Sequence, residues 1–254
     1  MQDNEPVTTY DPWAQRSLLH VQQLDTHLDQ IATRLDRLPE RSAAMEVMRE
    51  VEALRLSVVT LTTDVADIEL EVSKAEDDVA QVRARADRDR SLLDGGDITD
   101  GKQLTELQHE VGTLARRQQE LEDVEIEVLE RLEARKAELA EAREQLAERE
   151  AAASVAVAAS EAATGALNAE REELTAERAL KAKEIPADLL SLYERIRSDN
   201  GGVGAAHLQK GRCQGCRIQL SPVAMSAVRK ASPAELVRCE ECRAILVRDE
   251  ESGL

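Results

Sequence analysis

Apolar residues recur along most of this chain at alternating steps of three and four. One such seam covers residues 18–38 and resumes over residues 51–86, and a second covers residues 104–174. Steps of three and four place the apolar side chains on one face of a helix, which is the heptad pattern of coiled coils. The pattern therefore predicts long helices that bury a narrow seam.

Two interruptions divide these helices. Pro39 removes a backbone donor and disfavours helical geometry at the residue before it, so we expect a kink or break near residue 39. The sequence DGGDITDG combines glycine with aspartate and predicts a turn over about residues 94–102. Arms of nearly equal length flank this turn, so the second arm can fold back along the first and bury both seams.

Four cysteines lie near the end of the chain, in two C-x2-C pairs. Cys213 and Cys216 form the first pair, and Cys239 and Cys242 form the second, with 22 residues between the pairs. Two such pairs can present four thiolates to one metal ion, whereas cysteines that only fill space in a hydrophobic core have no reason to occur in this paired spacing. We therefore expect one structural Zn2+ ion, because four sulfur ligands leave no open position for catalysis.

The expected fold class is mostly α, a long antiparallel helical coiled-coil hairpin with a small C-terminal zinc ribbon. The hairpin is expected over residues 1–183, a connecting helix and a flexible glycine linker over residues 184–204, and the ribbon over residues 205–254. Seams from two chains could also meet in a dimer, so we expect a monomer or a homodimer.

Composition and charge narrow the range of functions. The chain of 254 residues has 33% charged residues, no Phe and one Trp, which leaves little material for the core of a conventional enzyme. The net charge of the whole chain is -18. The excess of acidic residues lies before the ribbon, whereas basic residues exceed acidic ones over residues 207–248. We expect a protein that is not an enzyme, with no membrane segment, in the reducing cytoplasm where paired cysteines bind metal.

Several segments resemble one known family, the bacterial proteins in which a helical hairpin precedes a four-cysteine zinc ribbon. The resemblance covers nearly the whole chain. It rests on LLHVQQLDTHLDQI, on LPE at residues 38–40, on KQLTELQHEV, on LYERIRSDNGG at residues 192–202, and above all on CQGCRIQLSP and LVRCEECRAILV. Arg243 departs from the pattern, because the family more often has Gly directly after the last cysteine.

The resemblance implies a non-enzymatic adaptor. Members of this family are often described as predicted nucleic-acid-binding proteins, and RNA binding has been attributed to them. Some relatives resemble chaperones or docking factors for an alternative sigma factor and for export machinery.

Two functions are therefore open for this chain. The first is an adaptor or scaffold that presents the zinc ribbon to a protein partner. The alternative is weakly sequence-specific binding of RNA or DNA through the basic ribbon, although the ribbon has no aromatic residue on which bases could stack. The candidate contact residues for either partner are Arg212, Arg217, Arg229, Lys230, Arg238, Arg243 and Arg248.

Overall fold

The computed structural model describes residues 9–96 and 98–254, so part of the expected 1–183 hairpin and one position of the expected turn lie outside the described residues. The chain divides into two compact units. We call residues 41–158 the central unit, and residues 9–40 together with 159–254 the terminal unit.

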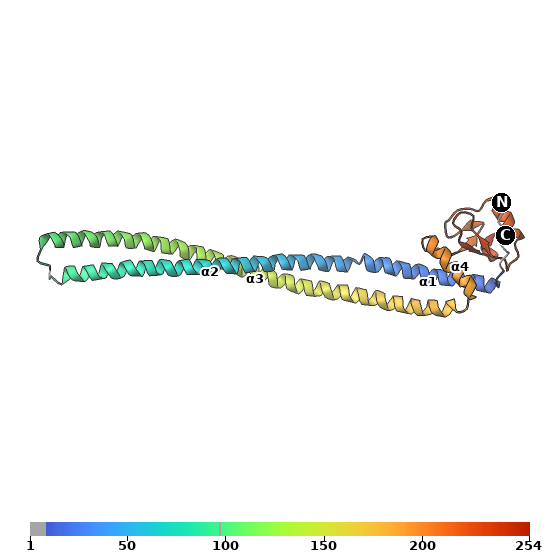
Figure 1. Ribbon diagram of the computed structural model, residues 1–254, viewed down its shortest axis with the longest axis horizontal. Helices are drawn as coiled ribbons and strands as arrows, with labels where there is room; N and C mark the ends of the chain where they lie inside the picture. Colours follow the sequence, from blue (N-terminus) through green and yellow to red (C-terminus); the bar gives the residue numbers. More distant parts are fainter. Residues whose placement is uncertain (1–8, 97) are drawn as a thin grey trace. The chain divides into compact units, whose positions relative to one another are not determined.

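The central unit is a pair of antiparallel helices. Helix α2 covers Pro39–Asp94 and helix α3 covers Gly101–Ala182. The turn connects them, and within this unit the two helices run side by side (Figure 1). Their seam residues form one apolar cluster, which includes Val65, Ile68, Val72, Val128, Leu132 and Leu139. The heptad pattern thus buries these residues between two helices of one chain.

Ion pairs cross the seam on its exposed flanks. Arg55 Nη2 lies 2.7 Å from Glu150 Oε1, and Arg83 Nη2 lies 2.9 Å from Glu122 Oε1. Exposed pairs of this kind contribute about 0 to 1 kcal/mol each. Burial of the apolar seam is therefore the main stabilising term, and the ion pairs favour one register.

The terminal unit begins with helix α1, Pro12–Asp36, which has Asp11 as its N-cap. The helix ends just before Leu38, and Pro39 is the first residue of α2, where a missing N–H costs nothing. Leu38 and Ile31 pack against Leu167 of α3 beside this break.

Helix α4, Ala187–Asp199, leads from α3 to a small sheet. The strands are β1 Ala205–Gln209, β2 Arg212–Cys213, β3 Val237–Arg238 and β4 Ile245–Val247, in the order β2-β1-β4-β3. Strands β1 and β4 are parallel, and the outer pairings are antiparallel. Helix α5, Pro222–Lys230, and the short helix η1, Glu250–Ser252, complete the fold.

The sheet packs directly on helix α1. Leu18 and Val21 of α1 share a buried cluster with Leu189 and Tyr193 of α4 and with Ile245 of β4. The expected fold class is confirmed: the protein is mostly α, with a long helical hairpin and a small C-terminal region that holds the four cysteines. Among the described helices, none combines the length and the apolar character needed to cross a bilayer.

Candidate metal centre

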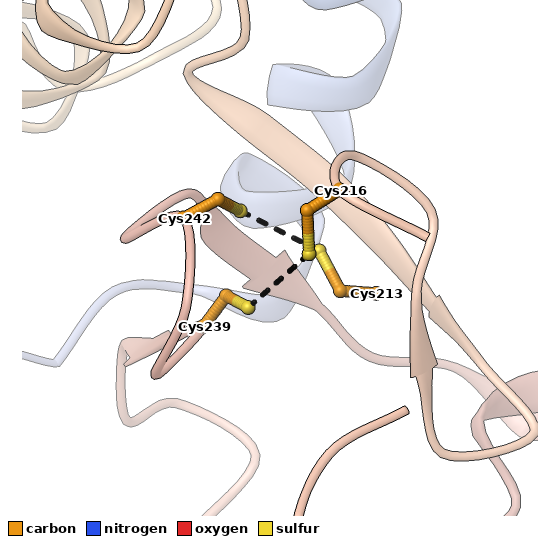
Figure 2. A group of neighbouring side chains, drawn as sticks. All are labelled: Cys213, Cys216, Cys239 and Cys242. Atoms are coloured by element: carbon orange, nitrogen blue, oxygen red, sulfur yellow. Dashed lines mark hydrogen bonds between the residues drawn. The ribbon is translucent and has the colours of Figure 1, made fainter. Parts of the chain in front are cut away.

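Two tight turns bring the four cysteines together. Cys213 ends strand β2, and Cys239 directly follows strand β3, so the sheet positions one cysteine of each pair. Cys216 and Cys242 come from the turns that follow. Figure 2 shows the first pair approaching from one side and the second pair from the other, with all four sulfurs directed at one point.

The two turns share one pattern of backbone hydrogen bonds. The N–H of Cys213 donates to the carbonyl of Ile218, and the N–H of Arg217 donates back to the carbonyl of Cys213. In the second turn, the N–H of Cys239 donates to the carbonyl of Ala244, and the N–H of Arg243 donates back to the carbonyl of Cys239. Each C-x2-C pair therefore forms a knuckle, and the two knuckles are equivalent.

The sulfur spacing fits tetrahedral zinc. The Sγ atoms of Cys213 and Cys242 are 3.8 Å apart, as are those of Cys216 and Cys239, and all four lie within 4.8 Å of one another. Four thiolates at Zn–S bonds of about 2.3 Å require sulfurs about 3.8 Å apart. The distances are too long for disulfides, and the four cysteines are free thiols.

The electrostatics of the four thiols also suit a cation. Burial raises the pKa of Cys213 and of Cys239, and neighbouring thiolates raise both further. Burial also acts to raise the pKa of Cys216, but the Ile218 N–H and the other sulfurs outweigh it and lower that pKa. Burial and mutual repulsion therefore disfavour the thiolate forms of Cys213 and Cys239, and a cation between the four sulfurs would stabilise them. All four coordination positions of that ion would be sulfur.

Comparison with known proteins agrees with this geometry. Residues 21–201 match the CT398-like coiled coil hairpin domain, and residues 212–246 match the C4-type zinc ribbon domain. The chain belongs to the CT398-like coiled-coil hairpin family. The family resemblance inferred from the sequence motifs is thereby confirmed, and the ribbon match supports a structural zinc ion.

The matches to relatives in this family cover nearly the whole chain. An uncharacterized protein of Mycobacterium tuberculosis is 39% identical over 234 residues, which are 92% of this chain and 95% of that protein. One from Mycobacterium leprae is 31% identical over 243 residues, with 90% and 98% covered.

Solved structures show the same fold. A structure from Mycobacterium smegmatis has a TM-score of 0.84 at 34% identity, covering 95% of this chain and 100% of that one. The structure of CT398 from Chlamydia trachomatis has a TM-score of 0.68 at 18% identity, covering 92% and 96%, and supports the fold alone.

The basic residues predicted as contacts differ in their surroundings. Arg212, Arg217, Arg229, Lys230 and Arg243 are exposed, and Arg238 is half-buried. Arg248 instead donates hydrogen bonds to five backbone carbonyls between Val228 and Glu235, at 2.6 to 3.4 Å. Burial lowers the pKa of Arg248. Its guanidinium therefore holds together the loop after α5. Arg229 also donates to a backbone carbonyl, that of Gly253, at 3.4 Å.

Polar residues that sequence reasoning missed hold the ribbon on α1. Gln22 is buried, and its side-chain oxygen accepts from the N–H groups of Gly204 at 2.7 Å and Ala205 at 3.2 Å. Its side-chain nitrogen donates to the carbonyl of Gly202 at 2.8 Å. Gln15 donates in the same manner to the carbonyls of Pro233 and Ala234. The glycine segment, expected to be a flexible linker, is thus tied to the helix.

A buried carboxylate links three helices near the same place. Asp25, only 3% exposed, accepts hydrogen bonds from Arg178 of α3 and from the Tyr193 hydroxyl of α4, the latter at 2.7 Å. Burial, and then the hydrogen bond to Asp25, raise the pKa of Tyr193. The only sequence signal for Asp25 and Tyr193 was their place in the motifs LLHVQQLDTHLDQI and LYERIRSDNGG, and Arg178 lies outside both motifs.

Proposed function

We propose that this protein is a non-catalytic adaptor whose ribbon, stabilised by one Zn2+ ion, docks on a protein partner. One observation supports this above all: the four sulfurs lie within 4.8 Å of one another, so they can supply all four ligands of one zinc ion and would leave no position for water or substrate. A zinc ion in such a site organises the surrounding chain and does no chemistry. The coiled-coil hairpin and the zinc ribbon fit this non-catalytic role.

The chemistry of the ribbon surface indicates the kind of partner. Arg217 and Arg243 are exposed at equivalent positions of the two knuckles, directly after the second cysteine of each pair. Ile218 and Val223 are exposed apolar residues nearby in the sequence, at 46% and 80%. We infer that the partner offers an acidic surface with an apolar centre, because interfaces combine an apolar core with a charged rim. The reducing cytoplasm, where thiols stay free for zinc, is the expected compartment.

Charge reversal of the knuckles tests this proposal. We expect the full-length double variant Arg217→Glu, Arg243→Glu to lose the partner that the wild-type chain retains in a pull-down from the native cell, while it still binds zinc. The matched control is Arg88→Glu, Arg116→Glu, which reverses two exposed arginines of the central unit. Retention of the same partner by the knuckle variant, or equal loss in the control, would contradict docking through the knuckles.

Nucleic-acid binding is the second candidate, and the number of exposed basic residues in the ribbon favours it. Besides Arg217 and Arg243 of the knuckles, Arg212, Arg229 and Lys230 are exposed. Such binding would depend on phosphate contacts, because the ribbon has no aromatic residue for stacking. It should therefore weaken steeply with salt.

A titration of the full chain with single-stranded RNA and duplex DNA separates the two candidates. If the second function is correct, affinity for either nucleic acid falls by a factor of about 10 or more between 50 and 200 mM salt. No binding at the lower salt concentration would exclude it.

A further inference from the structure

Helix α2 has a second apolar stripe, on the side away from its buried seam. Within the central unit, the large apolar residues exposed on this helix between residues 41 and 70 are Met45, Met48, Leu56, Val59 and Leu70. At 3.6 residues per turn they lie within an arc of about 80°, and the seam residues Val65 and Val72 lie on the opposite side of the helix. Leu56 and Leu70 are 69% and 71% exposed, so α3 does not cover them.

The stripe has a symmetrical order along the chain. Met45 and Leu70 are equally far from the midpoint between Ser57 and Val58. Leu56 and Val59 are also equally far from that midpoint. A helix with such a stripe matches a second copy of itself in antiparallel orientation, because Met45 then meets Leu70 and Leu56 meets Val59. In a two-fold symmetric interface the same patch serves both partners, as this pattern requires.

Charged and small residues follow the same symmetry. Arg49 and Asp67 are exposed and lie within one position of equivalent distances from the midpoint, so two reciprocal ion pairs would flank an antiparallel contact. Ala66 would likewise face Met48. Glu52 interrupts the stripe and would face Thr63, and a polar residue at one seam position fixes register at some expense of stability.

We propose that this stripe, residues 45–70 of α2, is the self-association surface through which two copies of the chain pair antiparallel. The segment is about 38 Å long at 1.5 Å per residue, and two copies would bury ten large apolar side chains between them. The chain has a net charge of -18, which opposes association, but Arg49 and Asp67 supply opposite charges at the stripe itself. We therefore expect a dimer of modest affinity.

Sedimentation of the full, zinc-loaded chain over about 1 to 100 µM protein tests the proposal. We expect the mass to rise from that of one chain to that of two. Leu56→Glu places a charge at the centre, next to the symmetry axis, and should raise the dissociation constant at least about tenfold, with unchanged helicity by circular dichroism. Val155→Glu is the matched control, because Val155 is 71% exposed, close to the 69% of Leu56, and lies in the central unit but belongs to α3.

Charge exchange tests the antiparallel register. Arg49→Asp alone and Asp67→Arg alone should each weaken the dimer, because each places like charges opposite one another. The double variant Arg49→Asp, Asp67→Arg should restore it. In a parallel pair each residue meets its own copy, so like charges face each other in the wild type and in every variant, and neither single substitution would weaken the dimer.

Three results would overturn the proposal. A chain that stays monomeric over this range has no such interface. A dimer that Leu56→Glu leaves intact, or that Val155→Glu weakens as much, uses another surface. A dimer that neither single charge variant weakens, or that the double variant fails to restore, has a different orientation.

Discussion

Arg217 and Arg243 each follow the second cysteine of a pair, and both have left-handed backbone geometry, with φ of 60° and 63°. This conformation favours glycine, and it costs a residue with a side chain about 1 to 2 kcal/mol. The departure noted at Arg243 is therefore a real conflict between residue type and backbone. The knuckle imposes the conformation, since the N–H of Arg243 must reach the carbonyl of Cys239.

Substitutions at Arg243 should change zinc affinity according to backbone preference. Because ribbon folding is coupled to metal binding, strain in the knuckle lowers the affinity. We expect Arg243→Val to weaken zinc binding by a factor of about 5 to 30, since a β-branched residue tolerates positive φ poorly. Arg243→Gly should bind zinc at least as tightly as the wild type. Competition with a chromophoric chelator measures both.

The control for this series is Arg212→Val. Arg212 is also exposed and next to a cysteine, but it lies in strand β2, where valine is favourable. Equal losses of affinity in Arg212→Val and Arg243→Val would show that the loss of positive charge, and not backbone strain, sets the affinity.

At the scale of elements, helix α1 does more than complete the coiled coil. One face of it pairs with α3, and the residues Gln15, Gln22 and Asp25 contact the loop before β3, the start of β1 and helix α4. Gly204 lies so close to Tyr193 that an added Cβ would stand 2.6 Å from that ring. The ribbon is therefore fixed to the helices of its unit by polar contacts as well as by the apolar cluster.

Gln22→Leu should loosen the start of strand β1. The substitution leaves the N–H groups of Gly204 and Ala205 buried without partners, at about 1 to 3 kcal/mol each. Hydrogen exchange of the Ala205 amide should accelerate by about tenfold or more. Gln23→Leu, at the exposed neighbouring position, is the control and should leave that amide protected. Unchanged exchange in Gln22→Leu would mean that the Gln22 hydrogen bonds contribute nothing to holding the strand.

At the scale of the whole molecule, the metal centre and the helical hairpin should have separate stabilities. The knuckles depend on four sulfurs, whereas the central unit is held by its own apolar seam. Chelation of the metal, or Cys213→Ser, should therefore unfold the ribbon, while most of the helical circular dichroism signal persists. The NMR signals of residues 205–254 should collapse toward random-coil positions.

The zinc content completes this prediction. Metal analysis of the wild-type chain should give one zinc per chain, and Cys213→Ser should lose it. Ribbon signals that keep their dispersion after the metal is removed would contradict a structural role for the ion.

Local patterns in the sequence were enough to predict the helices, the breaks between them and the zinc site. The three-four spacing of apolar residues gave helices and their buried face, because the period of a helix is set by its backbone. Pro39 and the glycines near residue 95 marked interruptions, because these residues restrict or free the backbone wherever they occur. The paired cysteines predicted a zinc site, because the two-residue spacing within each pair places two sulfurs in one tight turn, whatever the rest of the fold.

Only the tertiary structure decided which polar residues are buried and what they contact. Glutamine and arginine are residue types that usually lie on the solvated surface. In this protein, however, Gln22 binds a backbone segment about 180 positions away, and Arg248 binds the backbone carbonyls of a loop. Such contacts depend on how α1, α4 and the ribbon pack. No periodicity or spacing within one segment records that packing, because the partners meet only after the chain has folded.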